Sequence, residues 1–188
     1  MPNIYNTEVS SKHIQFTFGI SNLTIIKMAS VLERSILWLA PPECISCGIE
    51  GLALCVRCSS MIIPYGKRCW NCASLSTSCQ TCNRCRRPGS PVRVWVATTH
   101  EGLARKLLHT YKFDHQRAAA KDLARLMAMN FIDNNNSEYP NYLVVPVPTA
   151  TKRVRERGFN HSGLLARHIS RDLGLECQPV LGRIGQSR

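Results

Sequence analysis

The sequence lacks any run of 18 consecutive apolar residues, so no segment predicts a membrane span. The first 40 residues also lack the unbroken apolar stretch and small-residue cleavage site of a secretory signal peptide. We therefore predict a cytoplasmic protein in which residues 1–40 form a tail and a short helix. Met28 is a second plausible start, and residues 1–27 are expected to be either a disordered tail or an artefact of an upstream start.

Acidic residues are scarce relative to basic ones. The 188 residues include 24 Lys and Arg but only 12 Asp and Glu, which gives a formal net charge of +12. A zinc ion held by four thiolates carries a net charge of about −2, so two such sites would offset the basic residues around the cysteines. The lasting basic excess lies after residue 90, where 15 bases face eight acids. This excess is compatible with an anionic partner such as nucleic acid.

Cysteine is abundant and clustered, since nine of the ten lie between Cys44 and Cys85. Four C-x2-C pairs recur in this region, and a two-residue turn can aim both thiolates of a pair at one ion. Two pairs complete the tetrahedral site that zinc accepts, so residues 41–90 are predicted to form a double zinc ribbon with two structural zinc ions. The eight expected ligands are Cys44, Cys47, Cys55, Cys58, Cys69, Cys72, Cys82 and Cys85.

Spacing alone leaves the pairing of these ligands open. A sequential arrangement places the first four on one ion and the last four on the other, whereas a cross-braced arrangement joins the first pair to the third. Cys79 competes with Cys85 for the last pair, and we favour Cys85 because the basic turn at Arg86 follows it. Disulfides, a redox motif and an iron–sulfur cluster are less favoured, since i,i+3 bridges are strained and the evenly paired tandem motifs are typical of zinc.

Residues 91–188 alternate between strand and helix patterns, which predicts an α/β domain with a mainly parallel sheet and crossover helices. The expected elements are a strand at 92–97, helices around 103–111 and 123–131, a loop at 134–137, a buried strand at 142–146, a helix over 165–173 capped by Gly174, and a strand at 178–182.

A basic segment follows the predicted strand that ends at Pro146. Ligands of open α/β sheets bind beyond the carboxyl ends of strands, and helix N-termini attract anions. The segment therefore predicts a phosphate- or pyrophosphate-binding loop, although an exposed basic loop without a ligand is the simpler alternative. The candidate residues are Lys152, Arg153, Arg155, Arg157, Gly158, Phe159 and Asn160.

Three motifs together resemble the ComF family: the tandem cysteine pairs, Tyr111-Lys-Phe113, and Val144-Val-Pro-Val-Pro148 with Arg155-Glu-Arg-Gly-Phe-Asn160. The resemblance runs from about Met28 to the last residue. It implies a competence-associated, phosphoribosyltransferase-like protein with an N-terminal double zinc ribbon, in which the basic segment corresponds to the pyrophosphate loop of type I phosphoribosyltransferases. The implied fold is that ribbon (41–90) followed by an incomplete phosphoribosyltransferase-like sheet (91–188).

The chain departs from the family pattern at its end. Family members continue into a strand with two acidic residues and a Thr-Thr-Gly loop that holds phosphoribosyl pyrophosphate, and this sequence stops at Arg188 without them. We therefore expect a catalytically incomplete site, with magnesium phosphoribosyl pyrophosphate as a ligand only if a longer protein supplies the loop.

The leading functional hypothesis is a role in DNA uptake or nucleotide handling. The expected partners are single-stranded DNA or a nucleotide or pyrophosphate ligand, together with other DNA-uptake proteins. The alternatives are an active phosphoribosyltransferase, if the chain is a fragment, and a zinc-ribbon adaptor that binds protein.

Overall fold

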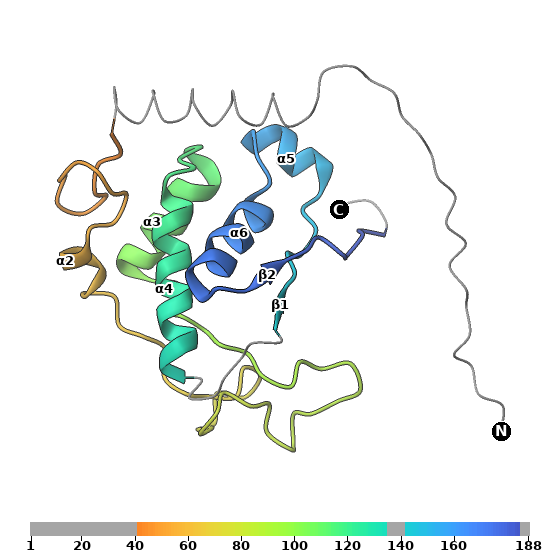
Figure 1. Cartoon of the computed structure of the whole chain (residues 1–188). Helices are drawn as coiled ribbons and strands as arrows, with labels where there is room; N and C mark the ends of the chain where they lie inside the picture. The colour runs from red at the N-terminus through yellow and green to blue at the C-terminus, as the bar shows by residue number, and fades with distance from the viewer. Residues whose placement is uncertain (1–40, 135–141, 185–188) are drawn as a thin grey trace, which may run out of the picture. The chain divides into compact units, whose positions relative to one another are not determined.

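The structure is a computed structural model that describes residues 41–134 and 142–184 (Figure 1). The predicted tail and short helix of residues 1–40 lie outside the described residues, as does the predicted loop beyond residue 134. No helix within the described ranges is long and apolar enough to cross a membrane.

The first ribbon, residues 41–59, is a small turn-rich unit. An antiparallel bridge joins Glu43 to Glu50, and the chain then enters the short helix α2 (Val56–Ser59). Cys55 caps this helix, because its Sγ atom accepts the backbone N–H of Cys58 at 3.4 Å. The cap holds two of the predicted metal ligands in one turn.

The second ribbon, residues 67–90, pairs with the chain segment that follows it. Arg68 bridges Leu75 within the ribbon, and Gln80 bridges Arg93 outside it. The predicted strand at 92–97 was wrong as a regular element, because the segment makes one isolated bridge, from Arg93 to Gln80 of the second ribbon, and does not join a described sheet. This segment pairs with the second ribbon through its backbone.

Two helices follow, as the apolar spacing predicted. The first is α3 (Gly102–Phe113) and the second is α4 (Ala119–Asn134). Both bury one face, with Leu107 and Tyr111 of α3 almost fully enclosed. The second helix buries mainly alanines, which allows the neighbouring chain to approach its backbone closely.

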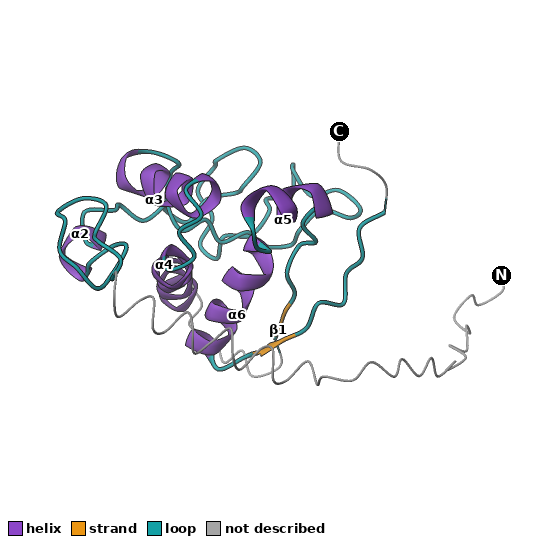
Figure 2. Ribbon diagram, turned by 90° about the horizontal axis from the view of Figure 1, so that it is seen from above, coloured by secondary structure: helices purple, strands orange, loops and turns teal. Residues whose placement is uncertain are grey.

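The sheet is a single parallel pair. Strand β1 (Leu143–Val144) pairs with β2 (Glu176–Cys177), and α6 (His161–Leu173) connects them. In both ribbon views α6 lies between α4 and this strand pair (Figures 1 and 2). Gly174 ends α6 in the left-handed conformation with φ 67°, as predicted.

Two sequence expectations for this part were wrong. The predicted strand at 178–182 is extended chain without a described strand, and pairing occurs earlier, at Glu176–Cys177. The strand expected at 142–146 is short and half-exposed instead of buried, with Leu143 43% exposed. The architecture is mixed helix with a small parallel sheet and two cysteine groups, as in an α/β zinc-ribbon protein.

The hydrophobic core joins the first ribbon to the helices. Its buried members come from both regions, so the boundary drawn at residue 90 does not divide the packing. They are Cys44, Ala53, Leu54, Cys58, Leu107, Tyr111, Ala119, Ala120 and Phe159.

Candidate metal centres and anion site

The structure gathers the predicted ligands into two groups of four. In the first ribbon the Sγ atoms of Cys44, Cys47, Cys55 and Cys58 lie within 4.8 Å of one another. In the second ribbon the same holds for Cys69, Cys72, Cys82 and Cys85. The grouping is sequential, so the cross-braced alternative is wrong.

Cys79 belongs to neither group among the described residues. It is only 5% exposed, so its side chain is buried within the second ribbon. Its backbone carbonyl accepts the N–H of Val94 at 3.1 Å, which ties the ribbon to the following segment.

The sulfur spacing suits a tetrahedral ion. With Zn–S bonds of about 2.3 Å, the edge of a regular tetrahedron is roughly 3.8 Å. The Cys47 and Cys55 Sγ atoms are 3.7 Å apart, and those of Cys72 and Cys82 are 3.6 Å apart. A disulfide would bring the sulfurs to about 2.05 Å. Each group could therefore hold one zinc ion, with all four positions supplied by protein.

Each group contains a buried thiol whose surroundings favour ionisation. Burial opposes ionisation of Cys44, but backbone N–H groups, led by that of Cys55, outweigh it and lower the pKa of Cys44 to about 6. In the second ribbon, backbone N–H groups led by that of Cys82 lower the pKa of Cys69 to about 6. Metal binding needs thiolates, so these amides favour the ligating form.

The last cysteine of each group shows the opposite effect. A hydrogen bond from Ser46 favours the Cys58 thiolate, yet burial and the neighbouring thiols raise the pKa of Cys58 to about 11. Cys85 behaves in the same way, since a contact with Asn71 is outweighed by Cys82 and the other thiols, and its pKa rises to about 11. Four thiolates without a cation repel one another, and a dication removes that penalty.

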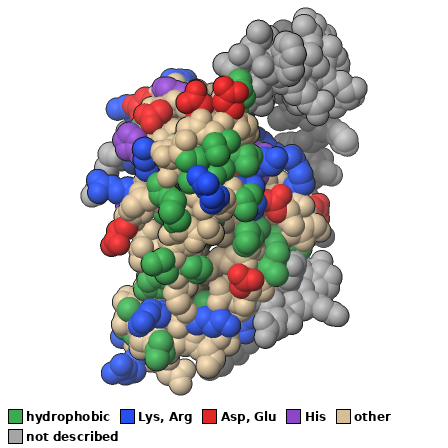
Figure 3. Space-filling model, turned by 90° about the vertical axis from the view of Figure 1, so that its left-hand side faces the viewer, with side chains coloured by type: hydrophobic (Ala, Val, Ile, Leu, Met, Phe, Trp, Pro, Cys, Tyr) green, Lys and Arg blue, Asp and Glu red, His purple; other side chains and the backbone are tan. Residues whose placement is uncertain are grey.

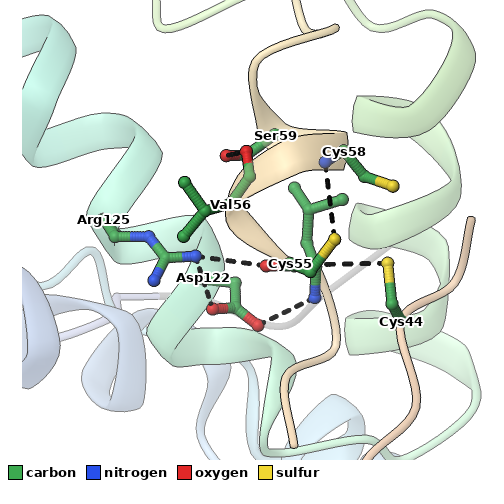
Figure 4. Close-up of polar contacts among 8 residues, drawn as sticks. Cys44, Cys55, Val56, Cys58, Ser59, Asp122 and Arg125 are labelled. Carbon is green, nitrogen blue, oxygen red and sulfur yellow. Dashed lines mark hydrogen bonds and ion pairs between the residues drawn. The ribbon is translucent and has the colours of Figure 1, made fainter. Parts of the chain in front are cut away.

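A buried carboxylate ties the first ribbon to α4, and sequence analysis did not identify it. Asp122 is 1% exposed and accepts the backbone N–H of Leu54 at 3.0 Å. Arg125 donates to the Leu54 carbonyl at 3.1 Å and to Asp122 at 3.0 Å, so the two side chains hold both polar groups of one ribbon residue (Figure 4). Burial raises the pKa of Asp122 against the effect of these donors.

The basic segment forms a helix where a loop was expected. Helix α5 (Thr151–Arg157) carries all four predicted cations, and Gly158 ends it with φ 76°, a conformation that favours glycine. Arg153 and Arg155 are exposed, and neither has an ion-pair partner among the described residues. Lys152 faces Glu156 at 3.9 Å on the helix surface.

The remaining predicted residues of this segment are structural in their contacts. Phe159 is buried against Tyr111, with ring centroids 5.5 Å apart. Asn160 caps α6: its Oδ1 atom accepts the Gly163 N–H and the Thr149 hydroxyl, each at 3.0 Å. These contacts fix where α5 ends and where α6 begins.

Arg157 is held in place at the join between the two helices. Its guanidinium lies over the Phe113 ring, 5.2 Å from the centroid, and its Nη1 atom is 3.4 Å from Nε2 of His161. Its carbonyl faces Nδ1 of His115 at 2.9 Å. Arg157 therefore links α5 to α3 and α6 through its contacts, and it also contributes a positive charge to this region.

Lys112 and His161 lie beside the predicted cations of α5, although the sequence analysis assigned neither a role. Burial lowers the pKa of Lys112, and the nearby charges of Arg157 and Arg153 lower it further. Burial also lowers the pKa of His161, with Arg157 and Lys112 adding to the effect. The Tyr111-Lys-Phe113 motif was the available signal, but only the fold brings α3 and α5 together.

The fold and the two cysteine groups define an α/β zinc-ribbon protein. The chain is similar to the competence protein ComFC of Streptococcus pneumoniae (strain ATCC BAA-255 / R6), with 30% identity over 110 residues. This match covers 57% of the chain and 48% of ComFC, so the chain spans about half the length of this curated relative. It confirms the resemblance to the ComF family. No protein-family model matches the chain, and no solved structure matches it significantly.

Proposed function

We propose that this chain acts in the cytoplasm as a ComF-like, competence-related protein that handles single-stranded DNA, with the zinc ribbons as scaffold and the α5–α6 region as a phosphate-binding site. The similarity to a competence protein supports the general role. Other DNA-uptake proteins are the partners that such a role requires.

The observation that carries the proposal is the gathering of like charges at α5. Lys112, Arg153 and Arg157 lie close enough for the two arginines to lower the lysine pKa. Two carboxylates close to these cations in the sequence already have partners, since Asp114 faces His109 at 3.6 Å and Glu156 faces Lys152 of the same helix at 3.9 Å. A phosphate placed among these cations would relieve their repulsion.

The start of α6 adds directed donors to this charge. Asn160 satisfies the Gly163 N–H, and the first turn of a helix still offers amide N–H groups toward an anion. A nucleotide, a pyrophosphate or a DNA phosphate presents the same chemistry here. Inorganic pyrophosphate should therefore compete with single-stranded DNA for the site.

The test is the salt dependence of single-stranded DNA binding by the zinc-loaded chain. Arg153→Ala with Arg155→Ala removes two exposed cations and leaves the structural Arg157 in place. Each lost phosphate contact on a single strand lowers the log–log salt slope by about 0.7, so we expect a slope flatter by about 1.4 and weaker binding to every sequence.

The matched control removes the same charge outside α5, from Arg171 in the last turn of α6 and from Arg183 after β2. Arg171→Ala with Arg183→Ala should leave the slope near that of the wild-type chain. Equal slope changes in the two double variants would show that net charge alone is responsible. No change in the α5 variant would place the phosphate contacts elsewhere.

A further inference from the structure

The second ribbon is basic to an unusual degree. The sequence contains no Asp or Glu from residue 51 to residue 100. Six bases lie in or beside the second ribbon, and all but Arg93 are exposed: Lys67, Arg68, Arg84, Arg86, Arg87 and Arg93. A zinc ion with four thiolates would cancel two of these charges and leave a net positive surface.

Trp70 is an exposed aromatic residue held in a fixed orientation on this ribbon. Its side chain is 45% exposed, and its Nε1–H donates to Oγ1 of Thr81 at 3.0 Å. Thr81 is itself buried and donates to the Pro91 carbonyl at 2.5 Å. The indole edge is therefore anchored to the ribbon, and part of the ring stays open to solvent.

Trp70 and the basic turn flank the same cysteine group. Trp70 lies between Cys69 and Cys72, and Arg84 lies between Cys82 and Cys85, whose sulfurs share one cluster. Arg86 and Arg87 follow directly. The lower part of Figure 3, where the second ribbon lies, shows basic and hydrophobic side chains interleaved.

We infer that the second ribbon is a base-stacking surface for single-stranded nucleic acid, separate from the phosphate site at α5. Trp70 stacks on an unpaired base, and Arg84, Arg86 and Arg87 contact the flanking phosphates. Every base offers a face for stacking, so such a surface needs no sequence preference. This inference rests on the proposed function, because both require a single-stranded DNA ligand.

Single-stranded nucleic acid fits this surface better than an acidic peptide does. The arginines would attract either ligand, but an anchored, half-open indole adds binding only where the ligand presents planar rings. Duplex DNA keeps its bases stacked and paired, so it offers them to Trp70 only at an energetic cost.

The experiment compares an oligothymidylate with an abasic oligonucleotide of equal length and charge. The wild-type zinc-loaded chain should bind the oligothymidylate about tenfold more tightly, because stacking on one aromatic side chain contributes roughly that factor. Trp70→Ala should bind both probes equally, and Trp70→Phe should restore most of the preference. Arg84→Ala with Arg86→Ala and Arg87→Ala should weaken both probes and flatten the salt slope by about two units.

Folding is checked by zinc content and helical circular dichroism, which should match the wild-type chain in every variant. Equal wild-type binding of the two probes, or an unchanged preference in Trp70→Ala, would overturn the inference. If the Trp70 and arginine variants of the second ribbon bind normally while the α5 double variant is impaired, the inference fails and the proposed function stands. If the wild-type chain binds neither oligonucleotide, the inference and the proposed function both fail. Trp70-dependent binding of polyglutamate that equals DNA binding would point to an acidic protein partner instead.

Discussion

The two ribbons have the same ligand arrangement and opposite surroundings. The first ribbon is packed into the helical core, where Cys44, Leu54 and Cys58 lie in one cluster with Tyr111 and Phe159. The second ribbon forms its hydrogen bonds internally or to the segment at 91–98. The same metal chemistry can thus stabilise either a whole domain or a single module.

The two ribbons also differ in net charge. The first ribbon carries Glu43 and Glu50 beside Arg57, so its charges nearly balance before metal is counted. The second ribbon has bases and no acid. The first ribbon is thus part of the folded core, whereas the second ribbon keeps most of its basic side chains exposed.

The strongest test of this comparison removes one buried ligand from each ribbon. Cys44→Ser should release one equivalent of zinc and unfold α3 and α4 as well, because zinc binding contributes roughly 10 kcal/mol or more in small zinc modules and a whole domain has about 5–15 kcal/mol of stability. Cys69→Ser should also release one equivalent but leave the helical circular dichroism largely intact. Zinc analysis and denaturant titration measure both effects.

Cys79→Ser is the control for these substitutions. It should keep two equivalents of zinc, because Cys79 lies outside both groups among the described residues. Equal loss of helical signal in Cys44→Ser and Cys69→Ser would show that the two ribbons are equally coupled to the helices. Loss of zinc from Cys79→Ser would contradict the ligand assignment.

The next test breaks the link between the first ribbon and α4 without touching a ligand. Asp122→Ala leaves the buried Leu54 N–H without its acceptor and Arg125 without its carboxylate, so we expect a loss of roughly 3 kcal/mol in the free energy of unfolding. Asp122→Asn keeps a side-chain oxygen for the Leu54 N–H and should lose much less.

Zinc stoichiometry should stay at two in both Asp122 variants, since neither changes a thiol. Denaturant unfolding at pH 7 gives the two free energies. Asp122→Ala with wild-type stability would show that this link contributes little and that apolar packing alone holds the ribbon.

The smallest expected effect concerns pH. The pKa of His161 is lowered in the folded chain, so the unfolded chain takes up a proton first as the pH falls below about 6.5. The stability contributed by this residue is complete above that pH and is lost as the pH falls through the folded pKa. His161→Phe should keep the ring contacts with Phe159 and show a smaller loss of stability between pH 7 and pH 5.5 than the wild-type chain.

His168 also has a lowered pKa, but the wild-type protein and the His161→Phe variant both retain it. The difference between their losses of stability therefore reports on His161. Identical pH profiles for the two chains would mean that the His161 imidazole titrates normally. The comparison should be made with zinc in excess, because acid also competes for the cysteine thiolates.

Local signals were read correctly from the sequence. The C-x2-C spacing predicted the eight cysteines that the structure groups, and Gly174 predicted the end of α6. These features depend on contacts within one short segment, such as Cys44–Cys58 or Cys69–Cys85. The loop predicted for the basic segment was wrong, because Thr151–Arg157 contains no glycine or proline, is rich in Lys, Arg and Glu, and is followed by Gly158, which can end a helix.

Long-range contacts could not be predicted from one sequence. Asp122 reads as a polar residue on a helix, and its burial depends on Leu54, which lies 68 residues earlier. Lys112 and His161 belong to the cationic site only because α3 packs beside the start of α6, as the 2.7 Å hydrogen bond from the Tyr111 hydroxyl to the His161 carbonyl records. The segment at 92–97, expected to be a sheet strand, pairs with the second ribbon instead. Alternation of apolar and polar residues does not show which of these two partners a segment will pair with.

The 68-residue separation between Leu54 and Asp122 has a consequence for the order of events on the ribosome. The described backbone partners of the second ribbon are complete once Val94 has emerged, so the ribbon can take up metal while synthesis continues. The first ribbon is made earlier but must wait for α3 and α4 to cover it. The ribbon that is translated first is therefore completed last. Until α3 and α4 have emerged, the nascent chain exposes Leu54 and the thiols of the first ribbon.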